Sequence, residues 1–291
     1  MTTAQTRNEI VAVLGGELSA YVALPVSGSS GPGILVLHEI FGVNDYIEDA
    51  CARLADIGYC ALAPDLFWRT QPGLALRHDD DGLAQGMAAA QRLDHVAAVR
   101  DAIAALGALR ALPEVADDSR AGVLGFCLGG TLAYQVAVHG EPDAAVCCYG
   151  SGIPDALQSA NAIACPTLLH FGAADPFIPR EQVDRVVAVA ARRREMECHV
   201  HEGAGHAFDN HLAPMFHDPR RRPALGSSRA ASSAVRCRST PGRRMAAIDE
   251  PGARNLTVRR ACNSAAQCHR SSPARRPCAS ASLRIAARSR R

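Results

Sequence analysis

Short apolar runs alternate with longer amphipathic segments from residue 9 to residue 201, and this alternation restricts the fold more than any other feature of the sequence. We expect buried strands at the apolar runs, which are residues 34–38, 59–63, 121–126, 144–149, 167–171 and 197–201. We expect helices at the amphipathic segments, which are residues 45–57, 82–109, 128–138 and 180–194. A β-hairpin over residues 11–24 precedes them. Strands and helices in alternation predict an α/β fold with a mostly parallel central sheet and helices on both faces.

The chain changes character at residue 220. Residues 1–219 hold 13 Arg and 27 acidic residues, whereas residues 220–291 hold 18 Arg and two acidic residues. All 13 aromatic residues lie at or before Phe216. A segment with so few large apolar side chains buries too little surface to offset its chain entropy. We therefore expect one folded domain at 1–219, followed by a disordered basic tail at 220–291.

The cysteines and the N-terminus indicate a reducing compartment. Eleven Cys are scattered without the spacing of a disulfide framework, and the count is odd. The first residues lack a basic region followed by an apolar stretch, and no run of about 18 apolar residues suggests a membrane span. We expect a cytoplasmic protein that has no membrane partner.

A glycine-rich turn at residues 125–130, with the sequence GFCLGG, carries the strongest chemical signal. It lies between a buried strand pattern and a helix, as the G-x-S-x-G nucleophile elbow does, with Cys127 in the place of Ser. Small residues permit the sharp turn, and the helix N-terminus favours a thiolate and binds an oxyanion. The alternative is a buried structural Cys beside a tight turn.

Two partners for Cys127 follow it in the order that this nucleophile arrangement uses. Asp175 comes directly after the apolar run at 167–171, and His206 comes shortly after the run at 197–201. We expect His206 to take the thiol proton and Asp175 to fix its tautomer. Each residue taken singly is usually a matter of ordinary turn chemistry, and together with the elbow they favour a triad.

A further acidic residue, Glu39, stands at the end of the first buried strand in the segment HEIFG, residues 38–42. Its carboxylate would face the nucleophile, and would hold the thiol protonated at rest or orient it. The backbone N–H groups of Ile40 and Leu128 are the expected oxyanion donors. The alternative for Glu39 is a solvated loop carboxylate.

These motifs, together with PDL at residues 64–66 and GAGHAF at residues 203–208, resemble the dienelactone hydrolase (carboxymethylenebutenolidase) family from about residue 10 to residue 217. The resemblance implies an α/β-hydrolase fold. It also implies hydrolysis of an ester or lactone by a Cys-His-Asp triad through a thioester acyl-enzyme, without metal or cofactor. The family's Glu engages the nucleophilic Cys at rest and is displaced by substrate, a role that would fall to Glu39.

The sequence departs from the family at its substrate-binding positions and at its end. Members that hydrolyse dienelactone bind the substrate carboxylate with two Arg. Here the first position is Asn210, and the second falls near Leu83, where Arg77 would substitute. We take Asn210, Phe41 and Arg77 as substrate-binding candidates. The amphipathic helix that closes the domain in the family has no counterpart after residue 219.

Two alternatives follow from that ending. The all-Arg, Ser- and Ala-rich composition after residue 219 is also that of a frameshifted product with impaired or absent catalysis. An Arg-rich tail would also bind polyanions without specificity, although it lacks the aromatic residues of a nucleic-acid module.

The histidines at 199, 201, 206, 211 and 217 lack metal-ligand spacing, so we expect no metal site. We expect a monomer that acts on a small molecule.

Overall fold

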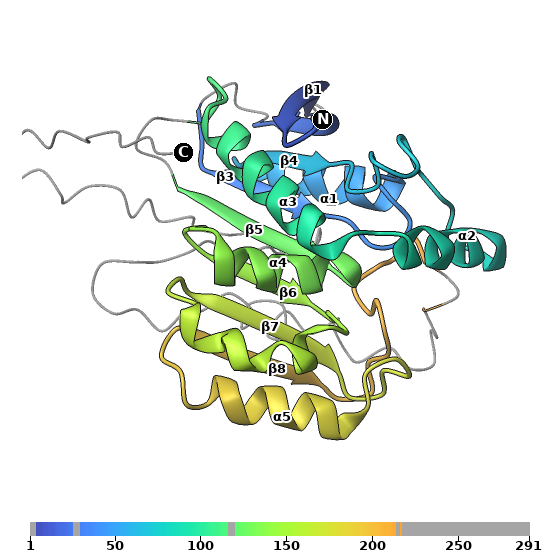
Figure 1. The fold of residues 1–291 in the computed structure, drawn as a ribbon, viewed down its shortest axis with the longest axis vertical. Helices are drawn as coiled ribbons and strands as arrows, with labels where there is room; N and C mark the ends of the chain where they lie inside the picture. Colours follow the sequence, from blue (N-terminus) through green and yellow to red (C-terminus); the bar gives the residue numbers. More distant parts are fainter. Residues whose placement is uncertain (1–3, 26–29, 116–119, 214–215, 217–291) are drawn as a thin grey trace, which may run out of the picture. The chain divides into compact units, whose positions relative to one another are not determined.

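The central sheet of the computed structural model has eight strands within the residues that the structure describes, which are 4–25, 30–115, 120–213 and 216 (Figure 1). Their order is β1-β2-β4-β3-β5-β6-β7-β8. In chain order the strands are β1 (Gln5–Val13), β2 (Gly16–Leu24), β3 (Gly33–Leu37), β4 (Cys60–Pro64), β5 (Ala121–Phe126), β6 (Ala145–Cys148), β7 (Thr167–Gly172) and β8 (Met196–His201).

Most of the sheet is parallel, which confirms the predicted fold class. Strands β1 and β2 form an antiparallel hairpin, and β2 joins β4 in an antiparallel pair. All remaining pairs, from β4 through β3 to β8, are parallel. Every residue of β3, β4, β5 and β7 is buried, as expected for strands covered on both faces.

Helices cover the two faces according to the direction of each crossover. The helices are α1 (Asp45–Asp56), α2 (Asp80–Gln91), α3 (His95–Arg110), α4 (Leu128–His139) and α5 (Arg180–Ala190). The chain moves one way along the sheet from β3 to β4, and the other way in every later parallel crossover. Because such crossovers are right-handed, α1 lies on one face while α3, α4 and α5 lie on the other (Figure 1).

The single helix expected over residues 82–109 is wrong, because the chain forms α2 and α3 instead. The break falls at Asp94, whose carboxylate accepts hydrogen bonds from the backbone N–H groups of Val96 and Ala97, both at 3.0 Å. An Asp side chain that caps a new helix competes with continuation of the previous one. The segment contains no Pro, and its Ala-rich composition hides the boundary.

The tail predicted at residues 220–291, and with it the boundary at residue 219, lies outside the described residues. Within the described part of the chain, no helix combines the length and the apolar composition that crossing a membrane requires.

Candidate active site

The residues singled out by their motifs follow the carboxyl ends of four parallel strands. Glu39 follows β3, Cys127 follows β5, Asp175 follows β7 and His206 follows β8. Strands β3 and β5 are neighbours, and the crossover direction reverses at β3. Ligands of open α/β sheets bind at such a switch point, outside the carboxyl ends of the strands. The topology therefore brings these four residues to one edge of the sheet.

Cys127 occupies a left-handed backbone conformation, with φ 53° and ψ −112°, immediately before α4. Residues other than Gly adopt such a backbone conformation only where the surrounding structure imposes it. Such residues are found mostly at functional sites. Its N–H donates to the carbonyl of Cys148 at 3.0 Å, which ties the turn to β6. The half-buried thiol therefore stands at the N-terminus of α4, as the elbow motif predicts.

The glycines of the elbow make room for neighbouring backbone. A Cβ on Gly129 would overlap the carbonyl of Leu37 and lie 2.7 Å from that of His38. The N–H of Gly129 also donates to the His38 carbonyl at 3.0 Å. A Cβ on Gly125 would overlap the carbonyl of Gly129. The elbow therefore packs directly against the end of β3.

Replacing Gly129 with Ala is expected to lower the free energy of unfolding by about 2–4 kcal/mol, because backbone on both sides must move to admit the methyl group. Urea unfolding followed by circular dichroism measures the change. Gly107 in α3 provides the control, because a Cβ there meets nothing within 4 Å. Gly107→Ala should raise stability by roughly 0.5–1 kcal/mol. Equal stability of the Gly129→Ala variant and the parent would contradict this packing.

His206 and Asp175 form a buried pair. The Nδ1 of His206 lies 2.8 Å from Oδ2 of Asp175, whose Oδ1 accepts the N–H of Phe177 at 2.8 Å. With Nδ1 engaged by Asp175, Nε2 is the ring nitrogen left for the Cys127 thiol, the second hydrogen-bond partner of His206. Burial lowers the pKa of His206, but the hydrogen bonds to Asp175 and Cys127 outweigh it and raise the pKa to about 10. The site therefore favours an imidazolium beside the sulfur.

Aromatic rings surround the His206 imidazole. Tyr149 and Phe177 each present a ring edge with centroids 5.0 Å from that of His206, and Phe216 lies at 6.0 Å. Tyr149 is fully buried, whereas 52% of Phe177 is exposed. The rings restrict the imidazole from several sides, and Phe177 forms the outer one.

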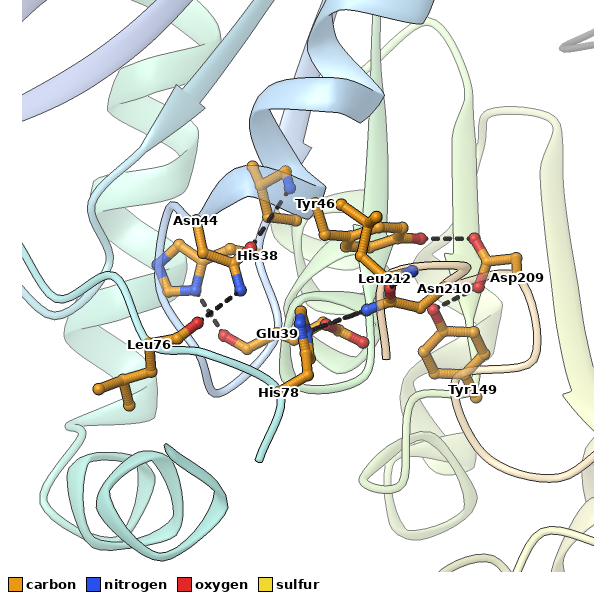
Figure 2. A network of polar contacts seen from close by, with 11 residues as sticks. His38, Glu39, Asn44, Tyr46, Leu76, His78, Tyr149, Asp209, Asn210 and Leu212 are labelled. Atoms are coloured by element: carbon orange, nitrogen blue, oxygen red, sulfur yellow. Dashed lines mark hydrogen bonds and ion pairs between the residues drawn. The ribbon is translucent and has the colours of Figure 1, made fainter. Parts of the chain in front are cut away.

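Glu39 is buried rather than solvated. Its Oε2 lies 3.0 Å from Nε2 of His78 and accepts a 2.9 Å hydrogen bond from Nδ2 of Asn210 (Figure 2). Burial raises the pKa of Glu39, and the hydrogen bond with His78 opposes that rise. Among the hydrogen bonds of the described residues, the Glu39 carboxyl has His78 and Asn210 as partners and not Cys127. The resting contact with Cys127 that the family resemblance implies is therefore not the arrangement seen here.

His38 fixes the backbone from which Glu39 projects. Its Nε2 accepts the N–H of Leu66 at 3.1 Å, so the ring proton is on Nδ1 and is donated to the Glu39 carbonyl at 2.6 Å. Burial lowers the pKa of His38, in keeping with a neutral ring. This histidine holds the end of β3 in place.

Asp209 anchors the loop that carries His206 and Asn210. Its two carboxylate oxygens accept hydrogen bonds from the hydroxyl groups of Tyr46, at 2.6 Å, and Tyr149, at 2.5 Å (Figure 2). Both tyrosines are fully buried. Their pKa values are raised well above the ordinary one, by burial first and by the Asp209 charge second. The sequence carried no signal for this anchor, because Tyr46 and Asp209 are 163 residues apart.

Of the three substrate-binding candidates, Phe41 and Asn210 both contact His78, whereas Arg77 stands apart. The Arg77 side chain is 92% exposed, with Nε 3.8 Å from Oδ2 of Asp79. Phe41 is buried against His78, with ring centroids 4.3 Å apart, and Asn210 binds Glu39. The residue after Arg77, His78, is thus the one that reaches the site, and the motifs did not reveal it.

The expected oxyanion donors also follow strands β3 and β5. The N–H of Leu128, the first residue of α4, has no acceptor within its own helix. Ile40 follows Glu39 at the end of the neighbouring strand β3, where the His38 carbonyl accepts the N–H of Gly129. No group of three or more His, Cys, Asp or Glu side chains in the described ranges is arranged to hold a metal ion.

Comparison with known proteins places the chain in a family. The model of the dienelactone hydrolase family matches residues 18–234. A carboxymethylenebutenolidase of Pseudomonas sp. strain P51 is 34% identical over 214 residues, which are 72% of this chain and 87% of the relative. Carboxymethylenebutenolidase 1 of Cupriavidus pinatubonensis is 30% identical over 209 residues, which are 72% and 88% of the two chains.

Solved structures agree with the sequence relatives. The dienelactone hydrolase-like promiscuous phosphotriesterase P91 from metagenomic libraries aligns with a TM-score of 0.61 and 28% identity, over 75% of this chain and 89% of the other. A dienelactone hydrolase from Anabaena variabilis shares the fold, with a TM-score of 0.54 and 16% identity over 73% and 93% of the two chains. The chain therefore belongs to the dienelactone hydrolase family of α/β-hydrolases, and is a hydrolase of ester or lactone bonds.

Proposed function

We propose that the protein hydrolyses a carboxylic ester or lactone with Cys127 as nucleophile, His206 as general base and acid, and Asp175 as the residue that orients His206. The observation that carries the proposal is the chain of hydrogen bonds from Asp175 through His206 to Cys127. Such a chain is the recurring arrangement of enzymes with an activated nucleophile.

The first half of the reaction forms a thioester. His206 holds the proton of Cys127, and the sulfur adds to the carbonyl carbon while the carbonyl π bond breaks. The N–H groups of Leu128 and Ile40 donate to the resulting oxyanion. When the tetrahedral adduct collapses, the C–O bond of the ester breaks, and His206 protonates the departing alkoxide.

The second half regenerates the enzyme. His206 takes a proton from water, and the hydroxide adds to the thioester carbonyl. The C–S bond then breaks, the carboxylic acid leaves, and the sulfur returns to its pairing with His206.

We further propose that the substrate is neutral at its acyl end. Glu39 and Asp209 place two acidic side chains near the site, and the charge of Asp209 is close enough to contribute to the raised pKa of Glu39, after burial. The candidate cation, Arg77, extends into solvent beside Asp79. Within the described residues, a substrate carboxylate would therefore meet acidic groups while the candidate guanidinium, that of Arg77, lies in solvent. The alternative of a polyanion-binding tail concerns residues 220–291, which lie outside the described ranges.

Trapping the acyl-enzyme tests the proposal. After mixing with p-nitrophenyl acetate and rapid acid quenching, mass spectrometry should find one acetyl group on the peptide that contains Cys127. An activated ester with a free carboxylate on its acyl chain should give a kcat/KM at least about tenfold lower. Acetylation of a different residue would refute the nucleophile assignment, and faster hydrolysis of the charged ester would refute the neutral substrate class.

A further inference from the structure

Three polar atoms from distant parts of the chain converge at the carboxyl end of β3, the strand that pairs with β5 ahead of the proposed nucleophile. Oε2 of Glu39, Nε2 of His78 and Nδ2 of Asn210 lie 2.9–3.0 Å from one another (Figure 2). They come from the loop after β3, the segment before α2 and the loop after β8. The side chains of Glu39 and His78 are 2% and 5% exposed, and Asn210 is 1% exposed. We call these three residues the Glu39 cluster.

The orientation of Asn210 makes its amide nitrogen a donor to the cluster. Its Oδ1 accepts the backbone N–H of Leu212 at 3.0 Å, so Nδ2 is the atom that faces Glu39 and His78. A primary amide nitrogen donates and does not accept. Asn210 therefore donates a hydrogen bond to whichever of its two neighbours has a free lone pair.

The contact between Glu39 and His78 holds one proton, on either Nε2 or Oε2. When it is on Nε2, His78 donates to Glu39, and Asn210 also donates to Oε2. When it is on Oε2, Glu39 donates to the single lone pair on Nε2 of His78, and Asn210 still donates to a lone pair of Oε2. Both proton positions leave each buried atom with a partner, so the carboxyl stays in place as the proton moves.

The cluster is held in place by packing as well as by hydrogen bonds. The ring of His78 packs against Phe41, with centroids 4.3 Å apart, and meets the edge of Tyr46 at 6.2 Å. The backbone carbonyl of Glu39 is fixed by His38. The other titratable groups that act on Glu39, or on which it acts, are Asp209, His206, Tyr46, Tyr149 and Cys148.

The backbone of Glu39 also leaves the sheet next to the elbow, because Leu37 pairs with Gly125 and Glu39 and Cys127 each follow two residues later. The carbonyl of His38, one residue earlier, accepts the N–H of Gly129, two residues after Cys127. A carboxylate released from its partners at this place would lie near the sulfur and, by repulsion between like charges, would disfavour a thiolate. The hydrogen-bond partners of the Glu39 carboxyl therefore influence how easily the Cys127 thiol loses its proton.

We propose that His78 is a positioning residue that, with Asn210, retains the Glu39 carboxyl and keeps its charge off Cys127, so that His206 alone governs the thiol proton. This role rests on the proposed function of Cys127. It differs from the resting Glu–Cys contact implied by the family resemblance, because here the carboxyl is held by other partners.

Two amide variants of His78 that differ by one methylene group provide the test. The side chain of His78→Gln can reach Oε2 and donate to it, whereas that of His78→Asn is too short. The readout is the rate of iodoacetamide alkylation of the peptide that contains Cys127, measured by mass spectrometry from pH 6 to pH 9. His78→Asn should slow alkylation at pH 7 by about tenfold and move its profile to higher pH. His78→Gln should stay within about threefold of the parent.

The Glu39→Gln background separates positioning from structural support. A neutral amide cannot repel a thiolate, so His78→Asn should have no further effect on alkylation in Glu39→Gln protein. An equal loss in both backgrounds, or no loss in either, would overturn the proposal. If His78→Asn fails to melt cooperatively, Asn210→Ala in the two backgrounds decides, because it removes the other partner of Oε2. A loss that Glu39→Gln abolishes supports positioning, and an equal loss in both backgrounds overturns it. The alkylation readout does not need turnover, so failure of the proposed hydrolysis would be seen separately, as p-nitrophenyl acetate hydrolysis that Cys127→Ala leaves intact.

Discussion

Cys127→Ala is expected to lower kcat/KM for p-nitrophenyl acetate on the order of 10⁴-fold, because no other described side chain is placed to form the acyl-enzyme with His206. The fold should be retained, since Ala replaces a half-buried side chain of similar size. Steady-state kinetics give the loss, and a thermal melt by circular dichroism checks the fold. We expect residual activity from the proposed oxyanion donors, which the substitution leaves in place.

Cys198 on β8 supplies the matched control. It is half-buried like Cys127, but burial raises the pKa of its thiol to about 12, so it is protonated at neutral pH. Cys198→Ala should therefore leave kcat/KM within about twofold of the parent. Turnover that survives Cys127→Ala in folded protein would show that another residue is the nucleophile.

Asp175→Asn is expected to lower kcat by roughly 10³–10⁴-fold, because it reverses the tautomer of His206. The N–H of Phe177 donates to Oδ1 of Asp175, so in the variant the amide oxygen should keep that place. The amide NH₂ would then face Nδ1 of His206 and donate to it. The ring proton would move to Nε2, where it blocks transfer from Cys127.

The same substitution changes the pH dependence of stability. Folding raises the pKa of His206 from an ordinary 6.5 to about 10, with Asp175 as the largest of the groups that raise it. That stabilisation is complete below pH 6.5 and is lost as the pH rises through 10. Asp175→Asn should therefore lower the free energy of unfolding more at pH 6 than at pH 10, as urea titrations at the two values would measure.

Asp184 provides a control of the same chemistry, because it lies exposed on α5 and pairs with Arg180 one helical turn away. Asp184→Asn should change stability by less than about 1 kcal/mol and leave kcat unchanged. A normal kcat in Asp175→Asn would mean that His206 is oriented by another group.

Much of the fold was predictable because its signals are local. The strands buried on both faces are continuous apolar runs, and the predicted strand over residues 121–126 agrees with β5 at both ends. The turn at residues 125–130 needs glycine because Gly125 and Gly129 face backbone at contact distance. The break at Asp94 was missed because the N–H groups of Val96 and Ala97 can bond either to the Asp94 carboxylate or to the preceding turn of a continuous helix. The local sequence does not show which of the two hydrogen bonds forms.

The surroundings of the candidate site were less accessible to prediction. Arg77 and His78 are adjacent in a segment without periodicity, so the sequence did not indicate which one turns inward. Asn210 was considered for its place after His206, but its partner Glu39 is 171 residues away. These contacts depend on how the loop after β3, the segment before α2 and the loop after β8 pack together. The local sequence pattern of each segment does not indicate that packing.

The sequence by itself determined the strand–helix alternation, the elbow that carries Cys127, and the placing of Glu39, Asp175 and His206 after strand ends. It did so because apolar periodicity and glycine turns reflect the backbone of their own segment. Only the tertiary structure decided that Glu39 is held by His78 and Asn210. Burial removes water as a partner for the carboxyl, and so the side chains that converge on it determine where it stays.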